Sequence, residues 1–275
     1  MKRILFNPKF DFVFKFNQYV EGFLQTNQLN GLIRNIDDFN FPLKKTFLEK
    51  SFPKINRLGK RVEFIFEEII KQDDSFVLLH SNVQLFQDKK TIGEIDYIFE
   101  RKNILFHLEI SYKFYLYDES HSNSLINCWI GPNRKDSLKL KLSKLQLNQF
   151  PIIQCEEFRR TRKKLNLNRP LRQMLLLKAQ LFIPFEKSVE LPENYNNCVE
   201  GSWLSMQNIH LLSKEDDYFI PEKKDWIINP KENQYWYSKE ILSTKVIEYH
   251  KRDFSPLVWL KTKENKFSKL FLVWW

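Results

Sequence analysis

The sequence is poor in the residues that mark several common classes of protein. It has three cysteines, no two of them in CxxC spacing, so neither a zinc site nor a disulfide framework is expected. Unpaired thiols fit a reducing compartment, and we expect a cytoplasmic protein. Among its six glycines there is no GxxxxGK[ST] phosphate-binding loop and no GxSxG nucleophile motif. The sequence therefore argues against an intrinsic ATPase and against a serine hydrolase of that type.

Long apolar runs are absent as well. No stretch approaches the ~18 uninterrupted apolar residues of a membrane span, and the opening MKRILFNPKF holds too short an apolar run for a signal peptide. We therefore expect no membrane association. What the sequence does contain is 25 phenylalanines and a hydrophobic content of 43% over 275 residues. That composition predicts a globular fold with a sizeable core.

The charge of the chain is strongly positive. Lysine and arginine number 44 against 34 aspartates and glutamates, a net charge of +10. Such an excess favours a polyanionic partner, nucleic acid first, with DNA expected before RNA. A basic soluble protein without such a partner would have the same balance, so charge alone leaves both possibilities open.

Hydrophobic periodicity predicts a mixed α/β fold. The predicted elements are, in order, a helix at 58–71, strands at 76–85, 91–100 and 103–115, a basic amphipathic helix at 135–150, a charged loop at 156–170 and a strand at 174–185. The ERKN link has hairpin length, so the second and third strands should be antiparallel neighbours.

Three regions are expected along the chain. Residues 57–185 hold the elements above and form the predicted core. Residues 1–56, rich in Phe and Asn, should add one or two short helices around it. Residues 186–275 contain recurrent prolines and six of the seven tryptophans, and they predict a smaller α+β appendage.

Two acidic residues interrupt the apolar strands of this core. Side chains alternate across a strand, so Glu109 shares its face with Ser111 and Lys113, while the opposite face is apolar. Asp96 lies on the polar face of the preceding strand. If the two polar faces coincide, Asp96 and Glu109 converge, and two close carboxylates repel unless a cation or proton lies between them.

The paired acids suit a divalent cation. Mg²⁺ or Mn²⁺ is typically held by one or two carboxylates together with substrate phosphate. An ordinary solvated strand face would also alternate acids with apolar residues, and alternation alone does not separate the two readings. His107, on the same face as Glu109, is either a ligand or water-positioning residue or a satisfied polar neighbour.

The order of elements and the acids together resemble the PD-(D/E)XK nuclease superfamily. The phrase GEID, followed thirteen residues after its Asp by the Glu of HLEIS, is similar to the GEID…VEVK signature of small members. The resemblance implies a restriction-endonuclease-like αβββαβ core with a mixed central sheet. It implies that Asp96 and Glu109 hold the metal and that Glu63 is the glutamate of the first helix.

A narrower resemblance concerns the lysine of that signature, whose place is taken by Ser111. The segments RVE, GEID, HLEISYKFYL, WIGPNRKDSLKLKL, LFIPF and EGSW, together with a glutamine near Gln149, are similar to a bacterial family, domain of unknown function family 1853, over roughly residues 57–275. Its E-x-x-x-K arrangement implies that Lys113 serves Glu109. The family's helix-opening motif is matched by Gly131, Pro132, Asn133, Asp136 and Lys141. If the resemblance applies, the amine of Lys113 lies near Glu109. The alternative is that Lys113 is only a polar residue at the end of the strand and that the site has lost its catalytic lysine.

Basic side chains outside the acidic site are candidates for contact with a phosphate backbone. They are Lys141, Arg159, Arg160, Arg162, Lys163 and Lys164. The last five lie in the predicted charged loop. A solvent-exposed loop with no nucleic-acid contact would have the same run of charges, so both interpretations stay open.

These observations predict a PD-(D/E)XK-like protein that hydrolyses phosphodiester bonds of nucleic acid with Mg²⁺ or Mn²⁺. Asp96, Glu109, Glu63 and Lys113 are its expected catalytic residues, the first two holding the metal. Two alternatives stay open. One is a catalytically silent nucleic-acid-binding module on the same fold, suggested by Ser111. The other is a protein-interaction scaffold with the Trp-rich C-terminal region as its contact surface.

Overall fold

The computed structural model describes residues 8–45, 53–231 and 235–275 and has a mixed α/β fold, as predicted. Its ten strands belong to one sheet with the order β2-β3-β4-β6-β7-β10-β9-β8, in which β1 pairs with β6 and β5 with β4. The strands are β1 (Asp37–Asp38), β2 (Val77–Gln87), β3 (Lys90–Arg101), β4 (Ile104–Tyr117), β5 (Trp129–Ile130), β6 (Leu171–Pro184), β7 (Val199–Ser205), β8 (Asp217–Phe219), β9 (Leu257–Lys261) and β10 (Phe267–Val273). The α-helices are α1 (Pro8–Gln25), α2 (Leu58–Lys71), α3 (Leu125–Cys128), α4 (Leu138–Lys144), α5 (Glu156–Lys164), α6 (Glu193–Asn196) and α7 (Lys239–His250).

Helix α2 has the predicted bounds, because one apolar stripe runs along its whole length. Val62, Ile65, Phe66 and Ile69 are almost fully buried in the core. The helix ends at Lys71, and the chain enters β2 after a turn in which Asp73 Oδ1 accepts a hydrogen bond from the backbone N–H of Ser75.

Strands β2, β3 and β4 form an antiparallel meander; each ends one or two residues beyond its predicted end, and β2 and β4 begin one residue later than predicted. Both hairpins turn through residues in the left-handed region: Asp88 and Lys89 in the first, Lys102 and Asn103 in the second. Strand β6 then pairs with β4 in parallel over twelve residue pairs, from Leu105↔Leu171 to Leu116↔Phe182. The chain order of helix, three strands, helix and strand is therefore as predicted.

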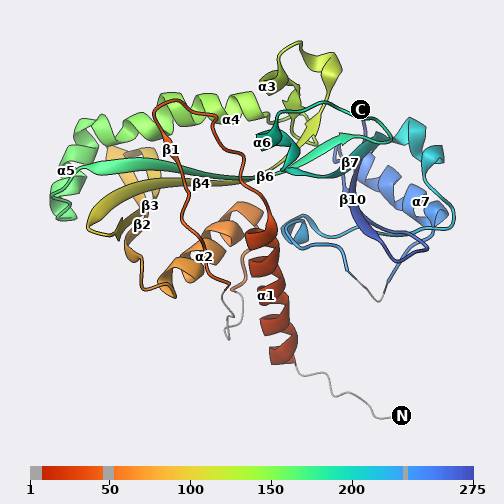
Figure 1. The fold of residues 1–275 in the computed structure, drawn as a ribbon, viewed down its shortest axis with the longest axis horizontal. Helices are drawn as coiled ribbons and strands as arrows, with labels where there is room; N and C mark the ends of the chain where they lie inside the picture. The colour runs from red at the N-terminus through yellow and green to blue at the C-terminus, as the bar shows by residue number, and fades with distance from the viewer. Residues whose placement is uncertain (1–7, 46–52, 232–234) are drawn as a thin grey trace.

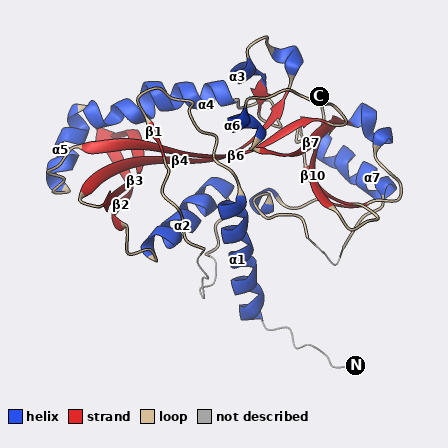
Figure 2. Cartoon of the chain, viewed as in Figure 1, coloured by secondary structure: helices blue, strands red, loops and turns tan. Residues whose placement is uncertain are grey.

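Helices cover both faces of this part of the sheet (Figures 1 and 2). Helices α1 and α2 lie on one face, where Phe106, Leu108 and Ile110 of β4 enter the main core cluster. Helices α4 and α5 lie on the other face, where the apolar side of α4 packs on β6 through Leu138 and Leu142. The face of β4 that carries its polar residues is thus turned toward α4.

The charged segment at 156–170 is not wholly a loop, and that prediction is wrong for its first half. Residues Glu156–Lys164 form helix α5. Cys155 caps its N-terminus, Glu156 and Glu157 occupy its first turn and three basic residues its last, which complements the helix dipole. Phe158 is the single buried side chain that anchors it. One apolar anchor in nine residues gives no helical stripe for sequence analysis to detect.

The C-terminal region continues the same sheet, through β7, β10, β9 and β8. Helix α1 packs on this region as well: the hydroxyl of Tyr19 donates to Asp225, and a Cβ added at Gly22 would lie 2.0 Å from the carbonyl oxygen of Ile227. Among its described residues, the N-terminal region thus contributes one helix, of 18 residues, and strand β1. Residues 1–7 and 46–52 of that region lie outside the described ones, and the predicted boundaries at 57 and 185 stay predictions.

Within the described ranges, no helix is both long and apolar enough for a membrane span.

Candidate active site

Asp96 and Glu109 meet where the ladder between β3 and β4 opens. The paired register runs from Arg101↔Ile104 to Tyr97↔Leu108, and the next two residues in line are Asp96 and Glu109. There the Asp96 side chain enters the gap: its Oδ2 accepts a hydrogen bond of 2.9 Å from the backbone N–H of Ile110. The opening of two strands therefore brings both acids to one point of the sheet.

The two carboxylates are electrostatically coupled. Burial and, after it, the charge of Glu109 raise the pKa of Asp96 to about 7, against the opposing effect of the Ile110 N–H. Glu109 is fully buried, and burial raises its pKa to about 7 as well. The positive charge of Lys141 lowers the pKa of both groups. At neutral pH the protein thus holds two carboxylates that a cation would stabilise in the ionised form.

Glu109 is fixed by donors on both oxygens. The Nε2–H of His107 donates to Oε1 over 3.0 Å, and the side-chain amide of Gln149 donates to Oε2. Burial lowers the pKa of His107 to about 4, so this histidine is neutral at neutral pH, and its Nδ1 accepts from Gln173 over 3.1 Å. Both ring nitrogens are therefore used inside the protein. His107 orients Glu109, which decides the question left open by the sequence in favour of a satisfied polar neighbour.

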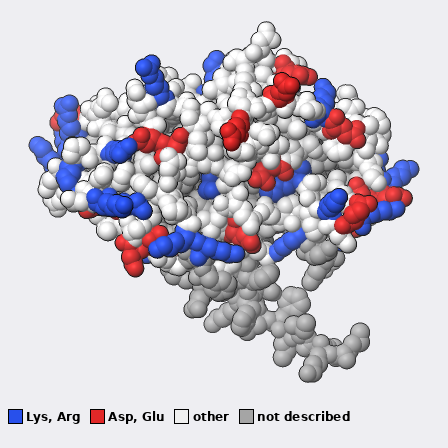
Figure 3. Space-filling view, viewed as in Figure 1, with Lys and Arg blue, Asp and Glu red and all other residues white. Residues whose placement is uncertain are grey.

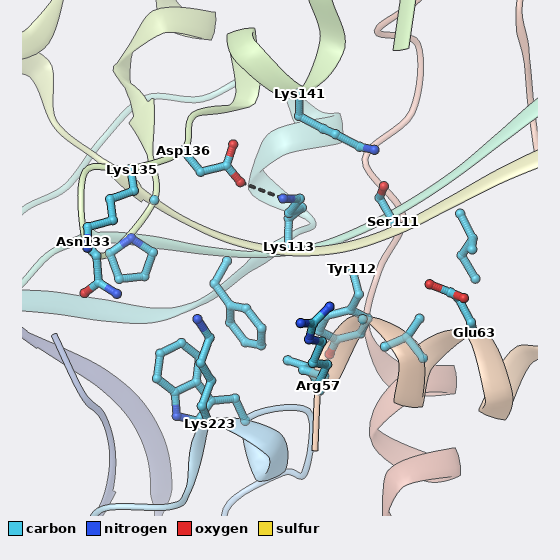
Figure 4. A pocket seen from close by; sticks show the side chains of 18 of the residues that line it. Arg57, Glu63, Ser111, Tyr112, Lys113, Asn133, Lys135, Asp136, Lys141 and Lys223 are labelled. Atoms are coloured by element: carbon cyan, nitrogen blue, oxygen red, sulfur yellow. Dashed lines mark hydrogen bonds and ion pairs between the residues drawn. The ribbon is translucent and has the colours of Figure 1, made fainter. Parts of the chain in front are cut away.

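Lys141 reaches the acids from the opposite side, on helix α4. Its Nζ donates to Oε1 of Gln149 over 3.2 Å, and Gln149 in turn holds Glu109. Figure 4 shows its side chain extending from α4 toward Ser111. Gln149 takes part because the helix continues past α4 as a π-helical segment, Leu145–Gln149; such irregular turns often occur at functional sites.

Lys113 does not contact Glu109. Its Nζ donates to Oδ2 of Asp136 over 2.6 Å (Figure 4), and no ion pair joins it to Glu109 among the described residues. The expectation that its amine lies against Glu109 is therefore wrong. One strand repeat beyond Ser111, the side chain emerges beside the turn at 131–136 and finds Asp136 there. The basic group coupled to both acids is Lys141, with Lys144 acting on Glu109 as well. The sequence places Lys141 in the family's helix-opening motif and among the candidate nucleic-acid contacts.

Glu63 of α2 completes the acidic side of the site. Burial raises its pKa, Lys60 at 2.6 Å opposes that shift, and the charge of Asp96 adds to it. The hydroxyl of Tyr97 donates to the backbone oxygen of Glu63 over 2.7 Å, which ties α2 to β3 beside Asp96. The structure thus brings three of the four predicted catalytic residues into one electrostatically coupled group.

A cleft of about 680 Å³ opens beside this group: Glu63, Ser111 and Lys141 line it, whereas the buried Glu109 and its neighbour Asp96 are not among its lining residues. Its walls come from the start of α2, from β4, from the turn at 131–136, from α4 and from the C-terminal region. Seven charged side chains line it: Arg57, Lys113, Lys135, Lys141, Lys223, Glu63 and Asp136. Arg57, Lys135 and Lys223 had no distinguishing sequence signal, because they come from separate loops and become neighbours only through the fold.

The basic residues of α5 divide into two kinds. Arg159 and Arg160 are mostly exposed, each 3.4 Å from a carboxylate oxygen of Glu156. Arg162 instead donates to the backbone oxygens of Leu167 and Arg169 over 2.7 and 2.8 Å, so it holds the segment after the helix. Lysine and arginine side chains gather at the end of the molecule where α5 lies, and elsewhere on that face they mix with acids (Figure 3).

The donor set fits a divalent cation of the magnesium type. Among the described residues, no three His, Cys, Asp or Glu side chains form a ready ligand group. Mg²⁺, however, is usually held by one or two carboxylates, with water and substrate phosphate supplying the remaining oxygens. Asp96 and Glu109 are such a pair, and their shared burial is electrostatically unfavourable without a cation.

A family model described as Domain of unknown function (DUF1853) matches residues 15–273. The chain belongs to this family. The match begins at residue 15 rather than near residue 57, so α1 from that residue onward lies within the region that defines the family. No curated protein and no solved structure matches the chain.

The raised pKa of Asp96 predicts how stability depends on pH in the absence of metal. A carboxyl whose pKa rises from 3.8 to about 7 on folding favours the folded state at low pH, and this contribution is lost as pH rises toward 7. Asp96→Asn removes that loss. In EDTA, its stability relative to wild type should increase between pH 5 and pH 8 by on the order of 1–3 kcal/mol, measured by urea unfolding. The charge of Asp96 raises the pKa of His107, so the substitution lowers that pKa; because the pKa of about 4 already lies below the pH range compared, the folded His107 is largely neutral there in both proteins.

The control is Asp74→Asn, at an exposed position after α2. Its difference from wild type should be the same at both pH values. If Asp96→Asn also shows a constant difference, Asp96 is not the electrostatically strained group described here.

Proposed function

We propose that the protein is a metal-dependent phosphodiester hydrolase acting on nucleic acid, with a core of the PD-(D/E)XK type. The observation that carries the proposal is the meeting of Asp96, Glu109 and Lys141 at the opened β3–β4 ladder, beside a cleft in which five of the seven charged lining residues are cations. The element order and the strand directions support it, since β2, β3 and β4 are antiparallel and β6 is parallel to β4.

Each residue has a defined task in this proposal. Asp96 and Glu109 would hold Mg²⁺ or Mn²⁺, with Glu63 assisting from α2. A bound divalent cation supplies an activated water and polarises the phosphate. His107 and Gln149 keep Glu109 in place through their hydrogen bonds to its two oxygens. Lys141 offsets the negative charge that develops on the phosphate during attack.

Lys141 takes the part that a lysine at Ser111 would have. It approaches the same carboxylates from α4 instead of from β4, and its pKa is lowered by burial and by the charge of Lys113 while Glu109 and Asp96 raise it. A partly desolvated ammonium interacts more strongly with a phosphate than one in water does. Although Ser111 stands where the nuclease signature has a lysine, the site still has a cation, which comes from helix α4.

The silent-module alternative rests on the absence of a lysine at Ser111, and Lys141 weakens that argument. The scaffold alternative needs exposed tryptophans. In the C-terminal region, Trp226 and Trp259 are at most 5% exposed and serve the core, while Trp274 is 38% exposed. Neither alternative explains why two acids and a lysine share a buried point of the sheet.

The proposal is tested by incubating the purified protein with single- and double-stranded DNA and RNA. Mg²⁺, Mn²⁺, Ca²⁺ and EDTA are compared at constant ionic strength. We expect products with Mg²⁺ or Mn²⁺ and none with EDTA, because the water must be activated by the cation. Salt-sensitive binding of nucleic acid without any cleavage across this panel would favour the silent module instead.

A further inference from the structure

Three cations in the cleft lack an acidic partner. Among the described residues, no carboxylate lies within ion-pair distance of Arg57, Lys135 or Lys223, whereas Lys113 has Asp136 at 2.6 Å. In Figure 4, Arg57 and Lys223 extend toward the space in front of Lys113. Arg57, Lys113 and Lys223 together are called the basic wall of the cleft, which Glu63 also lines.

The members of this wall repel one another. Partial burial lowers the pKa of Lys223, and the positive charge of Lys113 lowers it further. Lys113 acts in the same way on Lys141. Lys223 is held in place all the same, with its Nζ 5.6 Å from the centre of the Trp226 ring and 6.0 Å from that of Phe254. Like charges kept close in a cleft are stabilised when an anion lies between them.

The start of helix α2 adds donors to the same wall. Arg57 is its N-cap and makes no side-chain capping bond, so the first N–H groups of the helix lie at the cleft without a side-chain acceptor from the cap. At Gly59 an added Cβ would meet nothing within 4 Å, so the backbone there is open to a ligand. Helix N-termini of this kind favour anions, phosphate among them.

We propose that the cleft holds a second phosphate, bound by Arg57, Lys113 and Lys223 and distinct from the phosphate attacked at Asp96 and Glu109. The proposal rests on the proposed function and adds the substrate class: a single strand that places two phosphates in one cleft. The cleft volume lies within the range of small-ligand pockets, ~300–1,000 Å³, which suits a few groups of one strand rather than a double helix. The second phosphate is either a strand terminus or an internal diester.

Binding measured without metal tests this subsite independently of cleavage. A fluorescent single-stranded DNA oligonucleotide is titrated in EDTA, at several salt concentrations, with wild type and with Arg57→Gln, Lys113→Gln and Lys223→Gln. Each variant should raise Kd about three- to tenfold and reduce the slope of log K against log salt by about 0.7, as expected for one lost phosphate contact on a single strand. Lys223→Arg should retain most of the affinity.

Lys251→Gln is the matched control, since Lys251 lies just after α7, is 64% exposed and pairs only with Glu248 among the described residues. It should bind like wild type. If the three cleft variants bind as tightly as Lys251→Gln with an unchanged salt slope, the subsite is overturned. In that case, cleavage of nucleic acid by the wild-type protein would still support the proposed function. Conversely, if the wild-type protein cleaved nothing but the three variants bound more weakly, the subsite would stand and the proposed function would fail.

The source of the phosphate is read from three labelled oligonucleotides, with a 5′-phosphate, with a 5′-hydroxyl and in circular form. A preference of wild type for the 5′-phosphorylated strand that disappears in Lys223→Gln assigns a terminal phosphate. Equal binding of all three, equally weakened in Lys223→Gln, assigns an internal one. Binding that does not depend on Lys223 in any arm contradicts the subsite.

Discussion

Asp96→Asn should abolish metal-dependent cleavage, lowering the rate by at least ~10³-fold, because one of the two metal carboxylates is removed. The substitution keeps the shape of the side chain and an oxygen that can still accept from the N–H of Ile110. The fold at the opened ladder should therefore persist, and the loss should reflect charge and not unfolding. Glu109→Gln should have a comparable effect, since it removes the other carboxylate and disturbs its bonds to His107 and Gln149.

Initial rates with Mg²⁺ and Mn²⁺ check this prediction, with circular dichroism as the test of folding. Matched controls remove acids elsewhere: Asp74→Asn, at an exposed position, and Glu67→Gln, one turn from Glu63 on the same helix and paired with Lys71. Both should keep the wild-type rate. Folded Asp96→Asn and Glu109→Gln proteins that still cleave would remove these residues from the site.

Lys141→Ala should lower turnover by about 10²–10³-fold, as expected for the loss of one preorganised charge at the reacting phosphate. Its Nζ is coupled to both carboxylates and bonded to Gln149, whereas Lys113 is engaged by Asp136. Affinity for the nucleic acid should fall only by the contribution of one phosphate contact. The effect should therefore appear in kcat and much less in KM.

Lys139→Ala is the control for this prediction, because Lys139 is an exposed lysine two residues away on the same helix. Ser111→Lys in the Lys141→Ala background should restore part of the rate, since Ser111 lines the same cleft. A Lys141→Ala protein with the wild-type kcat would show that no lysine from α4 takes part. Loss of turnover in Lys113→Ala, with Lys141→Ala unaffected, would return the role to Lys113.

Elements with continuous local patterns could be predicted from the sequence. The apolar stripe of Val62, Ile65, Phe66 and Ile69 defines α2 to the residue, and alternation separates the face of Glu109 from the apolar face of β4. Helix α5 could not be predicted in this way, because Phe158 is its single buried residue. The acidic first turn and basic last turn of α5 are local helix signals, but in so charged a segment they were read as a charged loop.

The partners within the site depend on tertiary geometry. The basic group near Glu109 comes from α4, 32 positions further along the chain at Lys141. Gln149 was part of the family resemblance, but the π-helical segment that brings it to Glu109 was not predicted. Lys223 enters the cleft from a short helical turn in the C-terminal region. Which lysine serves a given acid is decided by packing, and sequence spacing pointed to Lys113 instead.

The central claim is that Asp96 and Glu109 share one metal ion, and Mn²⁺ binding measured by calorimetry at pH 8 tests it most directly. At that pH both carboxylates are largely ionised, since their pKa values are raised to about 7. We predict one Mn²⁺ bound per wild-type chain, binding at least ~10-fold weaker in Asp96→Asn, as reported for lost metal-site interactions of other proteins, and unchanged binding in Asp74→Asn. Wild-type protein that binds no Mn²⁺, or Asp96→Asn protein that binds it as tightly as wild type, would contradict the claim.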